Sequence, residues 1–175
     1  VQHTFALALY LFEKLSYYDN YVKSGQYHKS PNFSHYDMHF SELSGKTWGI
    51  VGMGAIGSRV SNVASAFGCN VVRCNLRDSK AHEEYKSLPF DEFLETCDII
   101  SLHCPLNDDT RDLFDIEAFR KMRPDSILIN VARGRVVNNN DLYRALNDNL
   151  IYGAGLDVLP TEPITEDNPL SHYSD

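Results

Sequence analysis

The sequence predicts an α/β protein of the Rossmann type, with a doubly wound parallel sheet and helices on both faces. Two observations support this prediction. A glycine-rich turn joins a short apolar strand at Thr47–Val51 to an amphipathic helix, and further apolar runs alternate with helical patterns as far as Leu156. Apolar strands that alternate with helices are typical of a parallel sheet whose two faces are both covered.

The turn contains Gly52, Gly54 and Gly57 with the spacing G-x-G-x-x-G. In a dinucleotide-binding turn, the first glycine allows the tight turn and the second lets a pyrophosphate approach the backbone. The third lets the helix pack closely on the strand. Phosphates then bind the free N–H groups of the first helical turn, where the peptide dipoles add about half a positive charge. Because a strand and a helix flank the glycines, we expect a dinucleotide site here.

Composition and charge limit the class of protein and its partners. The 175 residues fit one domain, and a formal charge of −8 disfavours nucleic acid and anionic membranes as partners. The four cysteines form no C-x-x-C pair, so free thiols in a reducing compartment are expected. The apolar run at residues 5–12 is too short to span a bilayer and does not resemble a signal peptide. We therefore expect a cytoplasmic protein.

The first 23 residues are predicted to form one helix, since no proline or glycine occurs before Gly25. The first three turns are apolar on nearly every face, which requires burial on all sides. This helix is either a core helix or a subunit-interface helix, and we favour the interface. The whole chain, 1–175, is thus assigned as one dinucleotide-binding domain in which residues 1–24 form a dimer interface. A long polar and aromatic connection follows, and its histidines lack metal-ligand spacing.

The inward face of the helix after the glycine turn is expected to hold Val60, Val63, Ala64 and Phe67. A second strand, Asn70–Cys74, comes next. NAD enzymes usually place Asp or Glu at its end, against the adenosine ribose, and here that residue is Asn75. Asparagine does not repel a 2′-phosphate, and Arg77 either pairs with such a phosphate or is a solvated loop residue. We expect NAD as the cofactor, with NADP as the alternative.

The rest of the chain is predicted to alternate helices at 91–96, 115–122 and 141–147 with strands at 98–102, 126–130 and 152–156. Sheets of this kind bind their ligands beyond the carboxyl ends of the strands. Those ends are Gly52, Asn75, the segment 103–105, the segment 131–133 and Asp157.

Three charged residues near these ends could take part in chemistry. The guanidinium of Arg133 is suited to bidentate capture of a carboxylate beside a carbonyl that is reduced, although a solvated loop arginine is the plain alternative. Glu162 is either a solvated loop residue or a carboxylate that raises the pKa of a histidine by about 1–3 units. Such a histidine stays protonated as a general acid near neutral pH. Asp157 could accept a hydrogen bond from a nicotinamide carboxamide or cap a turn.

Four motifs, VGMGAIGSRV, SLHCPLNDDTRDLFD, ILINVARGRVVN and GAGLDVLPTEP, occur in an order and spacing that resemble the D-isomer-specific 2-hydroxyacid dehydrogenases. That family includes D-lactate, glycerate, phosphoglycerate and formate dehydrogenases, and hydroxypyruvate and glyoxylate reductases. The resemblance covers essentially the whole chain. It implies reversible reduction of a small 2-keto acid to the D-2-hydroxy acid, and a homodimer formed through the cofactor domains.

The resemblance also implies a set of residues around the cofactor besides the three glycines: Ala55, Ile56, Asn75, Cys104, Pro105, Val131, Ala132, Arg133 and Asp157. The first two would lie against the pyrophosphate and the third against the adenosine ribose. The next two would lie along the adenine, and the last four around the nicotinamide. Arg133 would bind the substrate and polarise its carbonyl, and Glu162 would be the partner of the catalytic histidine.

Relative to the family, part of a substrate domain before residue 1 and a T-P-H segment with the catalytic histidine after residue 175 are expected to be missing. His172 follows Glu162 by only ten residues and has no Thr-Pro before it, so we do not expect it to be the general acid. The chain is therefore predicted to bind the dinucleotide and to turn over 2-keto acids poorly or not at all. The alternatives are a non-catalytic NAD(H)-sensing module of the corepressor type and a truncated gene product.

Overall fold

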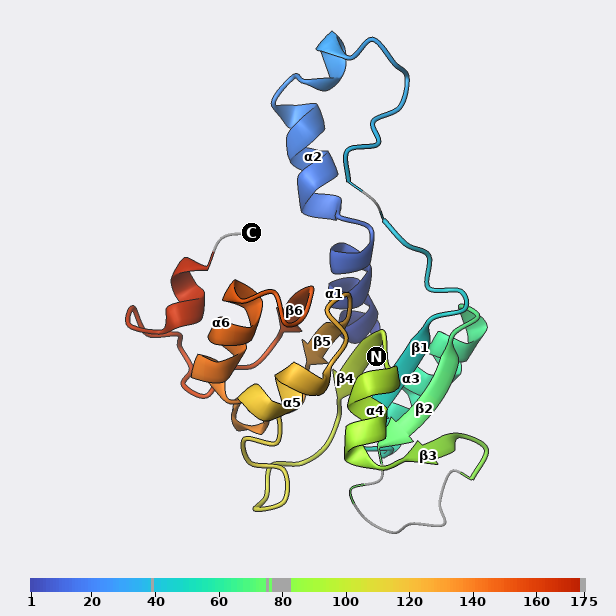
Figure 1. Ribbon diagram of the computed structural model, residues 1–175, viewed down its shortest axis with the longest axis vertical. Helices are drawn as coiled ribbons and strands as arrows, with labels where there is room; N and C mark the ends of the chain where they lie inside the picture. The colour runs from blue at the N-terminus through green and yellow to red at the C-terminus, as the bar shows by residue number, and fades with distance from the viewer. Residues whose placement is uncertain (39, 75, 77–82, 174–175) are drawn as a thin grey trace.

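The computed structural model describes residues 1–38, 40–74, 76 and 83–173. Its centre is a six-stranded sheet in the order β3-β2-β1-β4-β5-β6, and every strand pair is parallel (Figure 1). The strands are β1 (Thr47–Val51), β2 (Asn70–Cys74), β3 (Lys86–Leu88), β4 (Ile99–Leu102), β5 (Ile127–Asn130) and β6 (Gly153–Leu156). The chain leaves β1 in one direction along the sheet and returns to β4 on the other side. The predicted Rossmann-type topology is confirmed, with its switch point between β1 and β4.

Helices cover both faces of the sheet. On one face lie α1 (Gln2–Phe12) and α3 (Ala55–Ala66), and on the other lie α4 (Phe90–Thr96), α5 (Ile116–Lys121) and α6 (Asn139–Asn147). Successive strand residues serve opposite faces, because Ile50 packs with the first pair of helices and Val51 with the other three. The sheet is therefore buried on both sides, which explains its nearly continuous apolar strands.

Side-chain caps set the helix starts where the sequence was ambiguous. Asn138 accepts a hydrogen bond from the Asp141 amide, so α6 begins two residues earlier than predicted, and Asp115 caps α5 through the Ala118 amide at 2.9 Å.

The strand β3 was not predicted, because three residues give too little periodicity to recognise. The inward position expected for Phe67 is wrong. It is the C-cap of α3 and stays 45% exposed, although its ring stacks on Phe5.

The single N-terminal helix expected from the sequence is two helices. The helix α1 ends at Phe12, and α2 (Leu15–Lys23) begins after Lys14, whose left-handed backbone (φ 53°) breaks the helical path. The Lys14 ammonium lies 3.1 Å from the centroid of the Tyr152 ring, a cation–π contact that holds the break against the sheet. In α1, Phe5, Ala8 and Phe12 are buried, whereas α2 has no buried residue. Thus one face of α1 packs into the core, while Tyr10 stays 48% exposed. The assignment of residues 1–24 to a dimer interface stays a prediction.

The helix α1 lies directly on β6 because two glycines leave room for it. A Cβ atom on Gly155 would stand 2.9 Å from Leu7 Cβ, and one on Gly153 would stand 3.5 Å from Leu11 Cδ2. Four helical residues rise about 6 Å, close to the roughly 6.6 Å of two strand residues. The helix therefore keeps its register with the strand while running in the opposite direction, and its first turn reaches the carboxyl end of the sheet.

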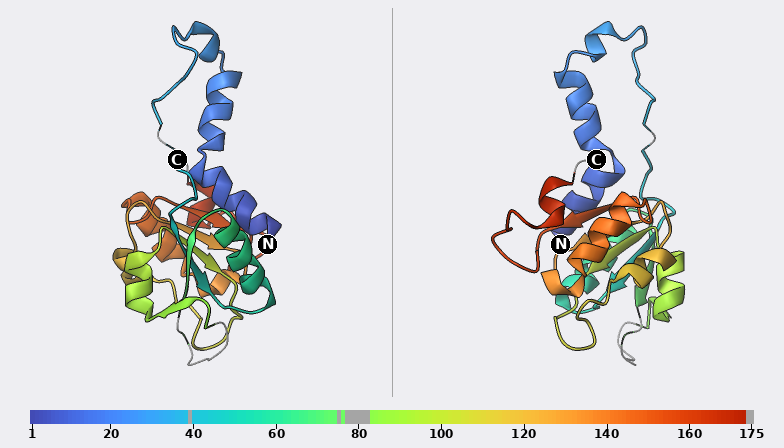
Figure 2. Two further views of the ribbon diagram at one scale, coloured as in Figure 1. Left: turned by 90° about the vertical axis from the view of Figure 1, so that its right-hand side faces the viewer. Right: turned by 60° about the vertical axis from the view of Figure 1, so that its left-hand side comes forward.

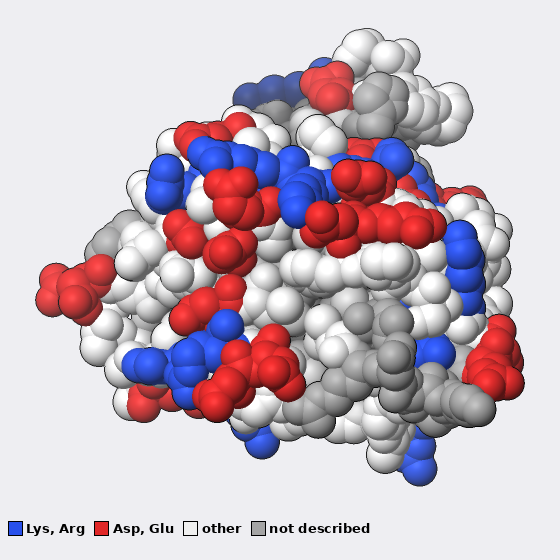
Figure 3. All heavy atoms as spheres, turned by 60° about the horizontal axis from the view of Figure 1, so that its bottom comes forward, with Lys and Arg blue, Asp and Glu red and all other residues white. Residues whose placement is uncertain are grey.

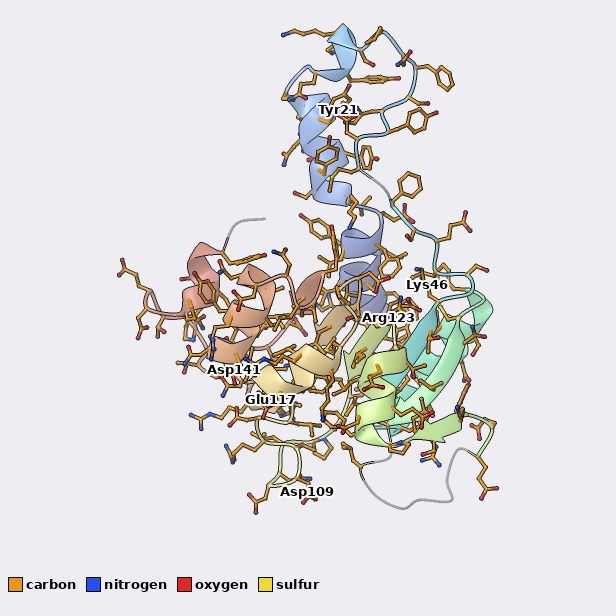
Figure 4. The ribbon with its side chains drawn as sticks, viewed as in Figure 1. Tyr21, Lys46, Asp109, Glu117, Arg123 and Asp141 are labelled. Carbon is orange, nitrogen blue, oxygen red and sulfur yellow. The ribbon has the colours of Figure 1, made fainter. Side chains whose placement is uncertain are left out.

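Residues 15–38 form an aromatic arm that projects from the domain (Figures 1 and 2). The arm consists of α2, a short 3₁₀ helix η1 (Tyr27–Lys29) and the returning chain. The Tyr21 ring stacks on His35 with centroids 3.8 Å apart, and the Tyr17 hydroxyl lies 2.7 Å from His35 Nε2 (Figure 4). His35 is therefore half-enclosed by aromatic rings and holds the two limbs of the arm together.

The amino ends of the central strands are tied together by Asp98. Its Oδ2 accepts the Thr47 N–H at 2.7 Å, while its Oδ1 lies 3.8 Å from Lys46 Nζ and 3.7 Å from Arg123 Nε. Lys46 and Arg123 lie far from Asp109, which sits in the loop after β4 at the opposite edge (Figure 4). These polar contacts therefore stabilise the edge of the sheet opposite to the carboxyl ends of the strands.

Charged side chains of both signs share the outer surface. Lys121 on α5 pairs with Asp91 on α4 at 2.7 Å, and Arg120 pairs with Glu117. Figure 3 shows acidic and basic side chains side by side over one face of the molecule. Among the described residues, no helix is both long and apolar enough to cross a membrane.

Candidate functional site

The glycine turn after β1 depends on two backbone contacts that exclude a side chain. Gly52 has φ +95°, and a Cβ there would stand 2.6 Å from Cys104 N. A Cβ on Gly57 would stand 2.2 Å from the carbonyl oxygen of Gly52. The His103 amide, in the segment after β4, donates to Val51 O at 2.7 Å. The turn is therefore packed against α3 and against the segment after β4. The tight turn predicted at Gly52 and the close packing predicted at Gly57 are confirmed.

Gly54 differs from these two glycines because the space beside it is open. A Cβ there would meet no atom within 4 Å, and the residue itself is exposed. Gly54 is also the N-cap of α3, so no side chain caps the helix, and its first turn holds no acidic residue. The amides of Ala55, Ile56 and Gly57 precede the first intrahelical bond, which runs from Ser58 N to Gly54 O. An uncapped twelve-residue helix with open space before it suits an anionic group such as a pyrophosphate.

A buried hydrogen-bond chain lies beneath the end of β4. Trp48 Nε1 donates to Ser101 Oγ at 2.9 Å, and the same hydroxyl lies 3.0 Å from His103 Nε2. Burial lowers the pKa of His103 to about 4, so its imidazole is neutral at physiological pH. Its Nδ1 is buried without a hydrogen-bond partner among the described residues. The sequence marked His103 only as a strand-end residue, since nothing local shows that Trp48 reaches Ser101 from the neighbouring strand.

The four cysteines are free and buried, as expected. Cys104 follows His103 at the carboxyl edge, with Pro105 exposed beside it. Burial raises the pKa of the Cys104 thiol, and it raises that of Cys74, at the end of β2, to about 12. Both thiols are therefore neutral at physiological pH, and neither has the depressed pKa of a nucleophilic cysteine. Their contribution to the edge of the site is apolar packing.

The loop after β5 is shaped by the buried Asn130 side chain. Its Oδ1 accepts the Ala132 amide at 3.0 Å, and its Nδ2 donates to Arg133 O at 3.1 Å. Arg133 itself is exposed, with Nη1 donating to Ala132 O at 2.7 Å. Val131 is half-buried and Ala132 buried, so both lie between the sheet and the edge. Asn130 thus fixes the backbone from which the Arg133 guanidinium extends into solvent.

The loop after β6 packs directly against this loop. A Cβ on Gly134 would stand 2.0 Å from the carbonyl carbon of Leu159, so only glycine allows the two backbones to meet. The Leu159 amide donates to Glu162 Oε1 at 2.9 Å, which turns the Glu162 carboxylate back onto its own loop. The structure therefore brings the Arg133 loop and the Glu162 loop into contact through Gly134, a residue the sequence interpretation had not used.

Asp157 stands at the end of β6 with its backbone held by the neighbouring strand. Its amide donates to Asn130 O at 3.0 Å, and its Oδ1 lies 3.2 Å from His3 Nε2 on α1. Both side chains are about half exposed, at 50% and 56% respectively. His3 was not predicted to be part of the site, because it is distant in the sequence and sits in an apolar segment.

Two hollows of the described surface lie away from the carboxyl edge. One of about 430 Å³ is enclosed by the aromatic arm, beside Tyr21 and His35, and one of about 230 Å³ lies near Phe12 and Lys46. The carboxyl edge is formed by the glycine turn and the loops after β4, β5 and β6. A ligand there would lie along the edge, held by backbone amides and a few side chains.

Residues 5–175 match the family model described as D-isomer specific 2-hydroxyacid dehydrogenase, NAD binding domain. The chain belongs to this dehydrogenase family. It is 35% identical over 171 residues to a hydroxypyruvate reductase of Blautia hydrogenotrophica, with 97% of this chain and 53% of the relative covered. The chain spans about half the length of the curated relatives it matches.

Solved structures of similar proteins agree with the fold. A D-lactate dehydrogenase of Aquifex aeolicus, complexed with NAD and lactic acid, superposes with a TM-score of 0.82 at 34% identity, covering 97% of this chain and 53% of that one. An acyclic imino acid reductase in complex with NADPH and D-Arg gives a TM-score of 0.85 at 33% identity, covering 97% and 52%. The first of these similar structures thus holds NAD and the second NADPH.

Most residues predicted for the dehydrogenase site lie at the carboxyl edge: Gly52, Gly54, Ala55, Ile56, Gly57, Cys104, Pro105, Val131, Ala132, Arg133 and Asp157. Glu162 lies on the loop after β6. Asn75 and Arg77 fall outside the described residues, as does the side chain of His172. The contacts of the predicted residues with a cofactor or substrate therefore stay predictions.

Proposed function

We propose that this chain binds a nicotinamide dinucleotide along the carboxyl edge, for the interconversion of a small 2-keto acid and its D-2-hydroxy acid. The observation that supports the proposal best is the uncapped start of α3 beside the open space at Gly54. The amides of Ala55 and Ile56 would hold the pyrophosphate there. The family model that the chain matches is that of an NAD-binding domain, and this match supports the proposed cofactor.

The remaining residues would align the rest of the cofactor along the carboxyl edge. Cys104 and Pro105 would contact the adenine side, and Asn75 the adenosine ribose. Val131 and Ala132 would line the nicotinamide side, where Asp157 would accept a hydrogen bond from the carboxamide. When bound, the nicotinamide supplies or receives the hydride of the reaction.

Arg133 and Glu162 would act on the substrate side of the nicotinamide. Arg133 has donors beyond the single bond to Ala132 O, and an exposed guanidinium can capture a carboxylate with two of them. Its positive charge would also polarise the adjacent carbonyl. Glu162 would face a histidine and keep that histidine protonated, so that it can deliver a proton to the carbonyl oxygen. The contact between the two loops at Gly134 would fix the spacing of these groups.

Calorimetric titration of the purified chain with NADH and, separately, NADPH tests the cofactor assignment. We expect NADH to bind more tightly, with Asn75 bonding the ribose hydroxyls. Tighter NADPH binding would mean that Arg77 pairs with the 2′-phosphate and that NADP is the cofactor. If neither dinucleotide binds, the proposed function is wrong.

We also propose that two copies of the chain associate through the aromatic arm. Large apolar side chains are exposed along and just beyond it: Leu15 at 48%, Val22 at 53%, Phe33 at 90% and Phe40 at 56%. Such a concentration of exposed apolar surface on a projecting segment is typical of a protein–protein contact.

Sedimentation velocity measures this association. We expect the wild-type chain to sediment as a dimer and the double variant Phe33→Ser/Phe40→Ser to sediment largely as a monomer. Ile164→Ser, which removes a 46% exposed side chain far along the chain from the arm, is the matched control and should remain dimeric. A monomeric wild type would contradict the proposal.

A further inference from the structure

We propose that His3 is a positioning residue for the nicotinamide end of the cofactor, because its imidazole holds the Asp157 carboxylate in the orientation that meets the carboxamide. The inference rests on the proposed function, in which Asp157 accepts a hydrogen bond from that carboxamide. It adds a residue from α1, an element that no other part of the predicted site includes.

The register between α1 and β6 places His3 over Asp157. His3, Leu7 and Leu11 are spaced four residues apart and share one face of α1. Leu11 lies over Gly153 and Leu7 over Gly155, as the atoms nearest to each glycine show. One further step along each element pairs His3 with Asp157. The contact between His3 Nε2 and Asp157 Oδ1, at 3.2 Å, is therefore the last in a row of contacts between the helix and the strand.

The packing of α1 against the sheet fixes the position of His3. Thr4 and Ala8 are fully buried and Phe5 is 7% exposed, and the Phe5 ring centroid lies 4.7 Å from that of Trp48. His3 therefore extends from the first turn of a helix that is fixed to the sheet. A donor held on such an element is better positioned than one on a free loop.

The geometry leaves one carboxylate oxygen for the ligand. The Asp157 amide is fixed by Asn130 O at 3.0 Å, and Oδ1 is held by His3 Nε2 at 3.2 Å. Within the described part of the chain, Oδ2 makes no hydrogen bond. A carboxylate that is held at its backbone and at one oxygen has few rotamers left, so its second oxygen is preorganised to accept from an amide N–H.

The test compares two ligands that differ only at the nicotinamide. NADH and ADP-ribose share the adenine, both riboses and the pyrophosphate, but ADP-ribose has no carboxamide. We expect His3→Ala to weaken NADH binding about tenfold, because an Asp157 carboxylate that rotates freely is no longer preorganised for the carboxamide, and to leave ADP-ribose binding unchanged. His3→Gln keeps a donor on the helix and should recover most of the NADH affinity. Gln2→Ala, at the exposed neighbouring position, is the matched control.

A second pair of variants tests the register itself. A Cβ on Gly155 would meet Leu7 Cβ at 2.9 Å and should shift α1 on the sheet, whereas one on Gly153 would meet only the end of the Leu11 side chain at 3.5 Å. Gly155→Ala should therefore weaken NADH binding without weakening ADP-ribose, and Gly153→Ala should affect neither.

The outcomes separate this inference from the function on which it rests. If His3→Ala lowers the affinity for both ligands equally, or for neither, the inference is overturned while the proposed function stands. A wild-type chain that binds neither NADH nor ADP-ribose would overturn both.

Discussion

Replacing Gly57 with alanine is expected to abolish measurable NADH binding and to destabilise the domain. The new Cβ would stand 2.2 Å from the carbonyl oxygen of Gly52, which is backbone and cannot move aside as a side chain can. Either α3 shifts away from β1 or the turn is rebuilt, at a cost of about 3 kcal/mol in stability. Both changes displace the amides proposed to bind the pyrophosphate, so we expect at least about a 100-fold loss of affinity. Thermal unfolding and calorimetry measure the two effects.

Gly54→Ala separates ligand binding from folding at the same turn. Its Cβ would meet no protein atom within 4 Å, and its backbone at φ −85° is accessible to alanine. Stability should fall by no more than about 1 kcal/mol, the cost of alanine at an N-cap. The methyl group would nevertheless occupy the space assigned to the pyrophosphate, so NADH binding should weaken markedly. Unchanged NADH affinity in Gly54→Ala would contradict the placement of the cofactor.

Replacing Gly134 with alanine is expected to separate the two loops that hold Arg133 and Glu162. The Cβ would stand 2.0 Å from the carbonyl carbon of Leu159, which is closer than any relaxed contact. Because loops move more easily than a packed helix, we expect a moderate loss of stability, about 1–3 kcal/mol, with a large local effect. The Leu159 amide, bonded to Glu162 Oε1, and the Ala132 amide, bonded to Asn130, should exchange hydrogen faster.

Arg135→Ala is the matched control, since Arg135 is exposed in the same loop and should leave these amides protected. The affinity of Gly134→Ala for ADP-ribose should stay near that of the wild type, because Gly134 is not among the residues proposed to contact the adenine or the pyrophosphate. Unchanged amide exchange in Gly134→Ala would show that the loop contact does not fix the spacing of Arg133 and Glu162.

Local patterns were sufficient to predict the sheet and the glycine turn. All five predicted strands are present, and β4 and β5 are buried at every residue. The parallel sheet follows from the alternation of these strands with helices. The pattern could not show that Lys14 ends α1, because the left-handed turn depends on a contact with Tyr152, far along the chain. Likewise β3 is defined by its pairing with β2 and has almost no periodicity of its own.

The candidate site could be predicted where the role of a residue depends only on its neighbours in the sequence. Gly52 and Gly57 are constrained by their own turn, so their spacing reveals them. Asn130, Gly134 and His3 act through residues on other elements, and no short motif contains both partners. A possible signal for His3 was its spacing with Leu7 and Leu11, matched to Gly153, Gly155 and Asp157, but that match is meaningful only once α1 is known to lie on β6.

The central claim is that a nicotinamide dinucleotide binds along the carboxyl edge, with its pyrophosphate at the start of α3. A ¹⁵N-resolved NMR titration of the chain with NADH tests this claim most directly. We predict that the amides of residues 54–57, 131–133 and 157 shift on binding, while those of the aromatic arm, including the walls of its hollow near Tyr21, do not. Shifts concentrated in the arm, with the amides of residues 54–57 unchanged, would contradict the account.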